Sequence, residues 1–80
     1  MKKPFQITAR FKSNEDAGKT SNLIFKDLDK AAATSKITVI DNTILISNTQ
    51  AGKNMQMVFG YFVDKLSSSE GFVSLNTNLL

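Results

Sequence analysis

The segment that most resembles a chemical motif is Ser13-x-x-x-x-Gly18-Lys19-Thr20, which approximates the phosphate-binding loop Gly-x-x-x-x-Gly-Lys-[Ser/Thr]. That loop needs its glycines because main-chain N–H groups wrap closely around the phosphates. Here Ser13 replaces the first glycine, and a second copy of the segment ends in Asn54 where the loop has a hydroxyl residue. We therefore interpret the segment as a repeated helix-capping or turn motif and expect no nucleotide site.

Residue types that usually carry catalysis are scarce in this chain. It has no cysteine and no histidine, which removes thiolate nucleophiles, the usual general base near neutral pH and the commonest metal ligand. The only acids that could form a group are Asp27, Asp29 and Asp64. Carboxylates two apart on a helix point in different directions, so they do not converge on a substrate or a cation. We therefore expect no enzyme, no cofactor and no metal site.

Positive charge is concentrated in the first half of the chain. Residues 1–36 hold eight Lys and Arg against four acids, whereas residues 37–80 hold two against three. A basic surplus of this kind raises the odds of a polyanionic partner such as nucleic acid, although an ordinary soluble surface with exposed lysines is the favoured interpretation. The candidate phosphate contacts are Lys2, Lys3, Arg10, Lys12, Lys19 and Lys53.

A short internal repeat indicates how these residues are positioned. The heptad Ser13–Lys19 recurs 34 residues later as Ser47–Lys53 with five of seven positions identical, and Phe25 and Phe59 extend the match. The same offset relates apolar positions of the two segments at helical spacing, with Ser21 as the polar exception. The repeat indicates one supersecondary unit used twice.

The first unit reads as a strand followed by a helix. Apolar residues alternate with polar ones from Phe5 to Lys12, which is typical of a half-buried strand. Ser13 and Asp16 have the spacing of a capping box, and apolar residues then follow at helical spacing until a predicted helix end near Thr34-Ser35.

The second unit begins with two β-rich runs, residues 37–40 and 43–46, joined by the two-residue turn Asp41-Asn42, where Asn42 tolerates a positive φ. A second capping box, Ser47-x-x-Gln50, predicts a helix to about Leu66, and Phe72–Leu75 predicts a closing strand before a frayed end. The order βαββαβ over one domain, residues 1–80, predicts an α+β protein of ferredoxin-like architecture with both helices on one sheet face.

An all-β sheet or barrel of hairpins is the alternative. Gly18 and Gly52 could supply positive φ in hairpin turns, and residues 20–25 and 54–63 could then be strands. Two glycines, two valines and three aromatics make the stretch around residues 52–63 a poor intrinsic helix. The two capping boxes and the alanine run at residues 31–33 favour βαββαβ.

The uncovered face of such a sheet decides between candidate partners. Its expected positions are Gln6, Thr8, Arg10, Lys12, Thr43, Leu45 and Ser47, and the absence of aromatics there disfavours stacking of nucleic-acid bases. Apolar side chains expected on this face could form a protein interface, sheet to sheet or edge to edge. The candidate interface residues are Ile40, Leu45, Val73 and Leu75.

These patterns together predict a small non-enzymatic binding or regulatory module that acts through protein–protein contacts as a homodimer, because a core of this size gains from further burial. The alternative is a basic regulator that contacts nucleic-acid phosphates through its N-terminal half. The longest apolar run is too short to span a bilayer, so we expect no membrane partner and a cytoplasmic location.

Overall fold

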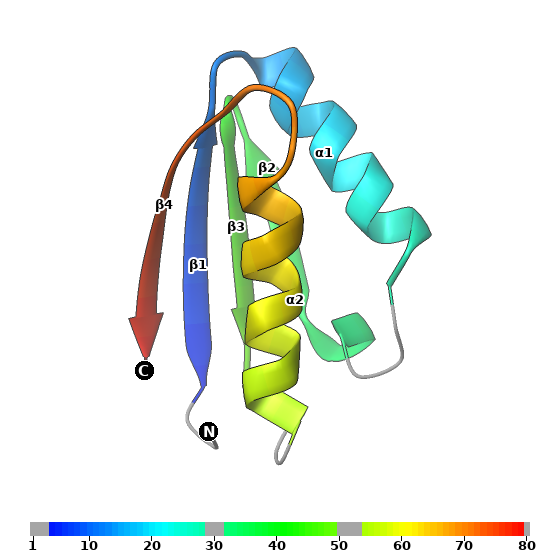
Figure 1. Cartoon of the computed structure of the whole chain (residues 1–80), viewed down its shortest axis with the longest axis vertical. Coiled ribbons are helices and arrows are strands. Elements are labelled where there is room, and N and C mark those ends of the chain that lie inside the picture. The colour runs from blue at the N-terminus through cyan, green and yellow to red at the C-terminus, as the bar shows by residue number, and fades with distance from the viewer. Residues whose placement is uncertain (1–3, 29–31, 50–53, 80) are drawn as a thin grey trace.

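Two helices lie side by side on one face of a four-stranded antiparallel sheet, so the protein is α+β (Figure 1). The computed structural model describes residues 4–28, 32–49 and 54–79. The strands are ordered β2-β3-β1-β4 across the sheet, which leaves β2 and β4 at its two edges. The elements are β1 (Phe5–Phe11), α1 (Asn14–Lys26), a 3-10 turn (Ala32–Thr34), β2 (Lys36–Ile40), β3 (Thr43–Asn48), α2 (Met55–Ser67) and β4 (Phe72–Leu79). The all-β alternative is therefore wrong.

The start of α1 confirms the capping prediction. Ser13 is the N-cap in an extended conformation, and its hydroxyl accepts a hydrogen bond from the Asp16 N–H at 3.1 Å. Glu15 and Asp16 occupy the first turn, where carboxylates stabilise the positive end of the helix dipole. The residues Gly18 to Thr20 lie inside the helix, so their N–H groups are not arranged as a phosphate-binding loop.

The end of α1 comes earlier than predicted. The helix stops at Lys26, and Asp27 caps it through an N–H bond to the Ile24 carbonyl, whereas the sequence pattern placed the end near Thr34-Ser35. The freed carbonyl of Asp27 accepts a hydrogen bond from the Tyr61 hydroxyl at 3.0 Å. A contact from α2, invisible to a local pattern, thus satisfies the terminal carbonyl and helps α1 to end there.

The turn between β2 and β3 forms at the predicted residues with a different backbone conformation. Asp41 has the positive φ, 54°, and no other described non-glycine residue does, so the turn does not use the tolerance of Asn42 for positive φ. Asn42 instead uses its side chain, donating from Nδ2 to the Phe11 carbonyl at 2.9 Å, while its own carbonyl accepts from the Phe11 N–H at 2.8 Å. These two bonds hold the turn against the end of β1.

The second helix does not begin at the predicted capping box. Ser47 lies inside β3, and α2 begins only at Met55 with Asn54 as an N-cap that makes no side-chain capping bond; Gln50 and Lys53 lie outside the described residues. Thus Asn14 is helical while its counterpart Asn48 is in a strand. The strand pairing of Ser47 with Gln6 and Lys36 outweighed its local capping preference.

The last strand is longer than predicted. Residues 76–79, expected to fray, continue β4 and pair with β1 as far as Phe5 opposite Leu79. One irregularity interrupts the ladder: Phe72 pairs with Phe11 and Ser74 with Arg10, so Val73 is an extra residue in a β-bulge.

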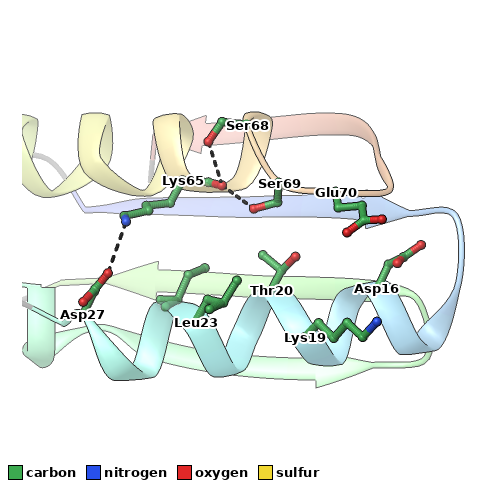
Figure 2. Close-up of a pocket in the computed structure, with 10 residues that line it drawn as sticks. Asp16, Lys19, Thr20, Leu23, Asp27, Lys65, Ser68, Ser69 and Glu70 are labelled. Carbon is green, nitrogen blue, oxygen red and sulfur yellow. Dashed lines mark hydrogen bonds and ion pairs between the residues drawn. The ribbon is translucent and has the colours of Figure 1, made fainter.

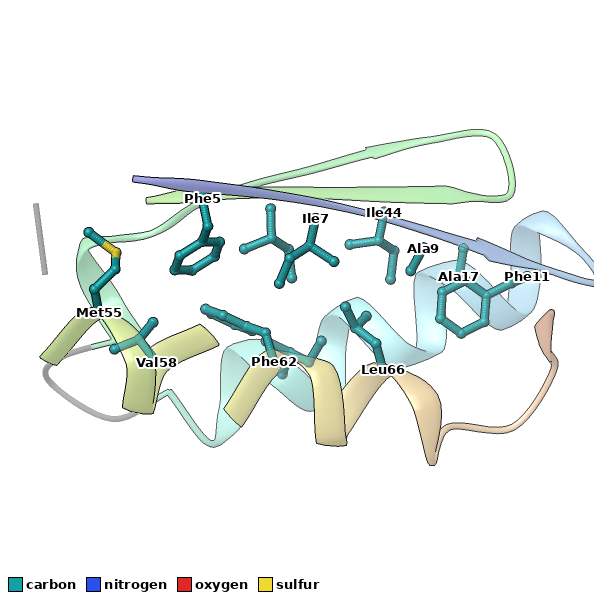
Figure 3. Packing of buried hydrophobic residues seen from close by; sticks show 12 residues of the cluster. Phe5, Ile7, Ala9, Phe11, Ala17, Ile44, Met55, Val58, Phe62 and Leu66 are labelled. Atoms are coloured by element: carbon teal, nitrogen blue, oxygen red, sulfur yellow. The ribbon is translucent and has the colours of Figure 1, made fainter. Parts of the chain in front are cut away.

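The core lies between the sheet and the two helices, where side chains from both layers meet (Figure 3). The inward positions of β1 and β3 alternate as the sequence predicts, and α2 contributes four buried residues at helical spacing. Aromatic edge contacts between Phe5 and Phe59 and between Phe11 and Phe72 close the two ends. The buried apolar residues are Phe5, Ile7, Ala9, Phe11, Ala17, Ile24, Ile44, Ile46, Met55, Val58, Phe62 and Leu66.

Candidate functional site

The sheet face opposite the helices is not covered by any described element, and we call it the open face. Its members follow from the register, since directly paired residues share a face and the buried residues of β1 and β3 define the opposite one. The open face consists of Gln6, Thr8, Arg10, Lys36, Thr38, Ile40, Thr43, Leu45, Ser47, Ser74, Asn76 and Asn78.

The open face is polar, with a small basic surplus. Hydroxyl and amide side chains form most of it, Arg10 and Lys36 are its only charged residues, and it carries no acid and no aromatic ring. The absence of aromatics agrees with the sequence argument against base stacking. Apart from Ile40 and Leu45 near the β2–β3 turn, such a surface offers hydrogen bonds and two cations rather than apolar area.

The four predicted interface residues are divided between different surfaces. Ile40 and Leu45 lie on the open face near the β2–β3 turn, and the Ile40 side chain is 53% exposed. Val73 is 56% exposed at the bulge of β4. Leu75 pairs with Ala9 and packs against the core, so its expected place on the open face is wrong. The bulge inserts one residue and thereby reverses which side chains of β4 point toward the helices.

The predicted basic cluster is not brought together. Among the described candidates, Arg10 lies on the open face, Lys12 follows β1, and Lys19 lies on α1; Lys2, Lys3 and Lys53 are outside the described residues. Lys36, which is not among the predicted phosphate contacts, lies on the open face beside Ser47. The alternation of Lys36, Thr38 and Ile40 indicates its position, since Ile40 is predicted to lie on the same face.

Lys19 has an acidic environment, which does not suit a phosphate contact. Its Nζ lies 3.2 Å from Glu15 Oε1, one helical turn earlier. The hydrogen bond and charge of Glu15, with smaller effects of Glu70 and Asp16, raise the pKa of Lys19 above 10.5. The ammonium is therefore engaged with carboxylates of its own surroundings, and an incoming anion would meet those carboxylates as well.

The outer side of β4 is a second candidate surface. Lys12 N–H donates to the Gly71 carbonyl at 2.8 Å, which makes Phe11–Phe72 a pair whose own main-chain groups do not bond to each other. Hydrogen-bonded and non-hydrogen-bonded pairs alternate along an antiparallel ladder. The main-chain N–H and C=O groups of Leu75 and Thr77 therefore point away from β1. We call this row of outward main-chain groups the free edge of β4.

The free edge of β4 lacks the features that usually protect sheet edges. The strand has eight residues and contains no Lys, Arg, Asp, Glu or Pro, and its bulge lies at one end. Natural edges are normally shortened, charged, bulged or covered. At the opposite edge, β2 has only five residues and begins with Lys36.

No protein-family model, no curated protein and no solved structure matches this chain. Within residues 4–28, 32–49 and 54–79, no three or more acidic side chains are grouped so that they could hold a metal ion. None of the described helices is long and apolar enough to cross a bilayer.

Asp27 forms an ion pair with Lys65 of α2 at 3.4 Å, so its partner lies on the other helix.

Proposed function

We propose that this protein is a small non-enzymatic binding or regulatory module that acts through protein–protein contacts, and that it forms a homodimer through the free edge of β4. The observation that carries the proposal is the long, uncharged edge strand, beside which no further described strand is paired. Unpaired main-chain N–H and C=O groups in such a strand bind another strand readily, because each gains a partner.

A second copy of the chain suits this edge better than a charged partner. A two-fold axis across two antiparallel β4 strands presents the same surface from both copies, and β4 contains no charge that would repel itself. Ser74, Asn76 and Asn78 would then face their equivalents on one side of a sheet that continues through both copies, and the open face would double in area.

Substitutions at Thr77 test the proposed dimer. Thr77→Pro removes an N–H of the free edge without removing a bond to β1, and Thr77→Lys adds a charge to that edge. Sedimentation equilibrium should give a concentration-dependent dimer for the parent chain, and each variant should weaken it by at least about tenfold, or 1.4 kcal/mol.

Thr49→Lys is the matched control, because it adds the same charge at an exposed residue outside β4 and should leave the dimer within about twofold. A strictly monomeric parent chain would reject the homodimer. A parent dimer that Thr77→Pro and Thr77→Lys leave intact would show that another surface forms it.

The finer architecture that we propose is the ferredoxin-like fold with a duplicated βαβ unit. The strand order and the position of both helices on one face are compatible with it. The 34-residue offset also relates buried helix positions, namely Ser21 to Met55 and Ile24 to Val58. The heptads themselves differ in structure, so the duplication is supported by the helical faces alone.

A second candidate function is binding of nucleic-acid backbones by the open face. It is favoured by Arg10 and Lys36 on a surface without acids, since cations, hydroxyls and amides are the usual contacts to phosphate oxygens. This assignment changes the predicted contact set, because Lys19 is paired with Glu15 while Lys36 takes its place.

Charge reversal tests the second candidate. In a fluorescence-anisotropy titration with labelled duplex DNA at two salt concentrations, log K should fall by about 0.9 per neutralised phosphate for each tenfold rise in salt. Arg10→Glu and Lys36→Glu should each weaken binding by about tenfold and reduce that slope. Lys26→Glu, on α1, is the control with the same charge change. Absent or salt-insensitive binding would reject this function.

A further inference from the structure

A pocket of about 340 Å³ separates α1 from the C-terminal end of α2 and the loop that leads to β4 (Figure 2). We call it the α1–loop pocket. Leu23 and Ile24 supply apolar surface, Asp16 and Glu70 lie at one end, and the Asp27–Lys65 ion pair lies at the other. It lies on the helical side of the molecule, so it shares no residue with the open face.

Thr20 is the residue that suggests a ligand. Its side chain projects from α1 toward the loop, and the residue is only 3% exposed. Its hydroxyl has no hydrogen-bond partner among the described residues. Among the described residues, every fully buried polar side-chain atom has a hydrogen-bond partner. The unpartnered Thr20 oxygen is therefore not fully buried, and it opens into the pocket that Thr20 lines. A hydroxyl held in this way can both donate and accept a bond from a molecule bound there.

The other polar groups of the pocket offer mainly acceptors. Ser68 Oγ donates to the Asp64 carbonyl at 2.7 Å and Ser69 Oγ donates to the Lys65 carbonyl, so both protons are used within α2 and the oxygen lone pairs remain. Lys65 is engaged with Asp27 at 3.4 Å. A pocket with free acceptors and engaged donors selects a ligand that brings its own donors.

The charges favour a cation. Asp16 and Glu70 form no ion pair with a described residue, whereas Lys19, which also lines this end of the pocket, pairs with Glu15 at 3.2 Å. Two carboxylates at one end are therefore not neutralised by a direct contact. A metal ion is the weaker choice, because no group of three or more acidic side chains suited to a metal exists within the described residues.

We propose that the α1–loop pocket binds an organic ammonium ion, a primary amine carried on a short apolar chain. The ammonium lies at Asp16 and Glu70, where its N–H groups meet carboxylate and hydroxyl oxygens including that of Thr20, and the alkyl chain lies on Leu23 and Ile24. Charge-assisted hydrogen bonds give the orientation, and the apolar surface adds affinity for the chain.

An NMR titration of the isotope-labelled full chain with n-butylamine tests this assignment. Amide signals of α1 and of residues 68–70 should shift and saturate, with a dissociation constant on the order of millimolar for so small a molecule. Equal concentrations of 1-butanol or butyrate should give no saturable shift, since neither carries the ammonium. Unsaturable butylamine shifts, or saturation by butanol as well, would overturn the proposal.

Substitutions then locate the site. Glu70→Gln should weaken butylamine binding by about tenfold and Thr20→Val by about threefold, while Asp64→Asn, an equal charge change outside the pocket, should leave it unchanged. Leu23→Arg alters a residue that is 63% exposed, so it should fold normally, and its guanidinium should weaken binding by placing a positive charge on the surface that the alkyl chain contacts. Equal affinity for the parent, Glu70→Gln and Leu23→Arg would reject the site.

Two further titrations distinguish this proposal from a metal site and from the proposed dimer. Saturable Ca²⁺ shifts at the same amides without butylamine binding would show a metal site and overturn the ammonium assignment. Thr77→Lys should bind butylamine like the parent chain, because the free edge of β4 does not line the pocket. Failure of the dimer prediction therefore leaves this proposal standing, and the reverse also holds.

Discussion

Gly71→Ala is expected to lower the free energy of unfolding by about 3 kcal/mol, the largest effect predicted for this chain. Gly71 has φ of 80°, a conformation that costs an L-residue free energy, and it lies directly against the Asp16 side chain. A Cβ there would lie 2.8 Å from Asp16 Cβ and closer still to the Asp16 carboxylate. Urea denaturation monitored by circular dichroism measures the difference.

The chain provides a matched control for this substitution. An added Cβ at Gly18 or Gly60 meets no atom within 4 Å, and both glycines lie inside helices. Gly60→Ala should therefore raise the free energy of unfolding by about 0.5–1 kcal/mol, since alanine restricts the unfolded chain and favours the helix. Equal effects of Gly71→Ala and Gly60→Ala would contradict the structure at Gly71.

A double substitution separates the two causes of the expected loss. Asp16→Ala removes the atoms that the new Cβ would meet, so Asp16→Ala combined with Gly71→Ala should be less destabilised than the sum of the single variants. The residual loss, about 1–2 kcal/mol, then measures the unfavourable positive φ. If the two substitutions are additive, the contact with Asp16 does not contribute.

Gly71 has this influence because three connections meet at the end of β1. The Gly71 carbonyl accepts from Lys12 N–H, while Phe11 exchanges main-chain and side-chain bonds with Asn42 of the β2–β3 turn. The β1–α1, β2–β3 and α2–β4 connections are thus tied together next to the α1–loop pocket. A shift at Gly71 would also displace Glu70, so Gly71→Ala should weaken butylamine binding as well.

Local features of the fold were predictable because they depend on neighbouring residues. The alternation of Phe5, Ile7, Ala9 and Phe11 identified the inner face of β1, and the Ser13 hydroxyl caps α1 as its spacing to Asp16 indicated. The first prediction depends on the two-residue alternation of side chains along a strand, and the second on how far a side chain extends within one helical turn. The same reasoning placed Arg10, Ile40 and Leu45 on the open face.

Long-range features were not predictable from local pattern. Ser47 has the spacing of a helix cap and is paired in a sheet instead. The sequence pattern predicts the wrong face for Leu75, because nothing in the sequence reveals the bulge at Val73. The α1–loop pocket was missed for the same reason. Its defining residues, Thr20 and Glu70, are 50 positions apart and signal nothing separately.

Asn48→Ala is expected to lower the free energy of unfolding by about 2 kcal/mol. Asn48 is 2% exposed at the end of β3, and its Nδ2 donates to Thr34 Oγ1 at 2.9 Å and to Ser35 Oγ at 2.8 Å. These bonds attach the end of β3 to the turn that introduces β2, whose five residues otherwise pair only with β3. Truncation removes the donor from both hydroxyls and leaves a small void beside them.

Asn76→Ala, the same change on the exposed strand β4, should alter stability by less than about 0.5 kcal/mol. Ser35→Ala should lose part of its effect when Asn48 is already alanine, because the two side chains share one bond. Hydrogen exchange should show the loss first in the amides of β2, the strand that depends on this attachment. An Asn48→Ala variant as stable as Asn76→Ala would mean that β2 is held by its pairing with β3 alone.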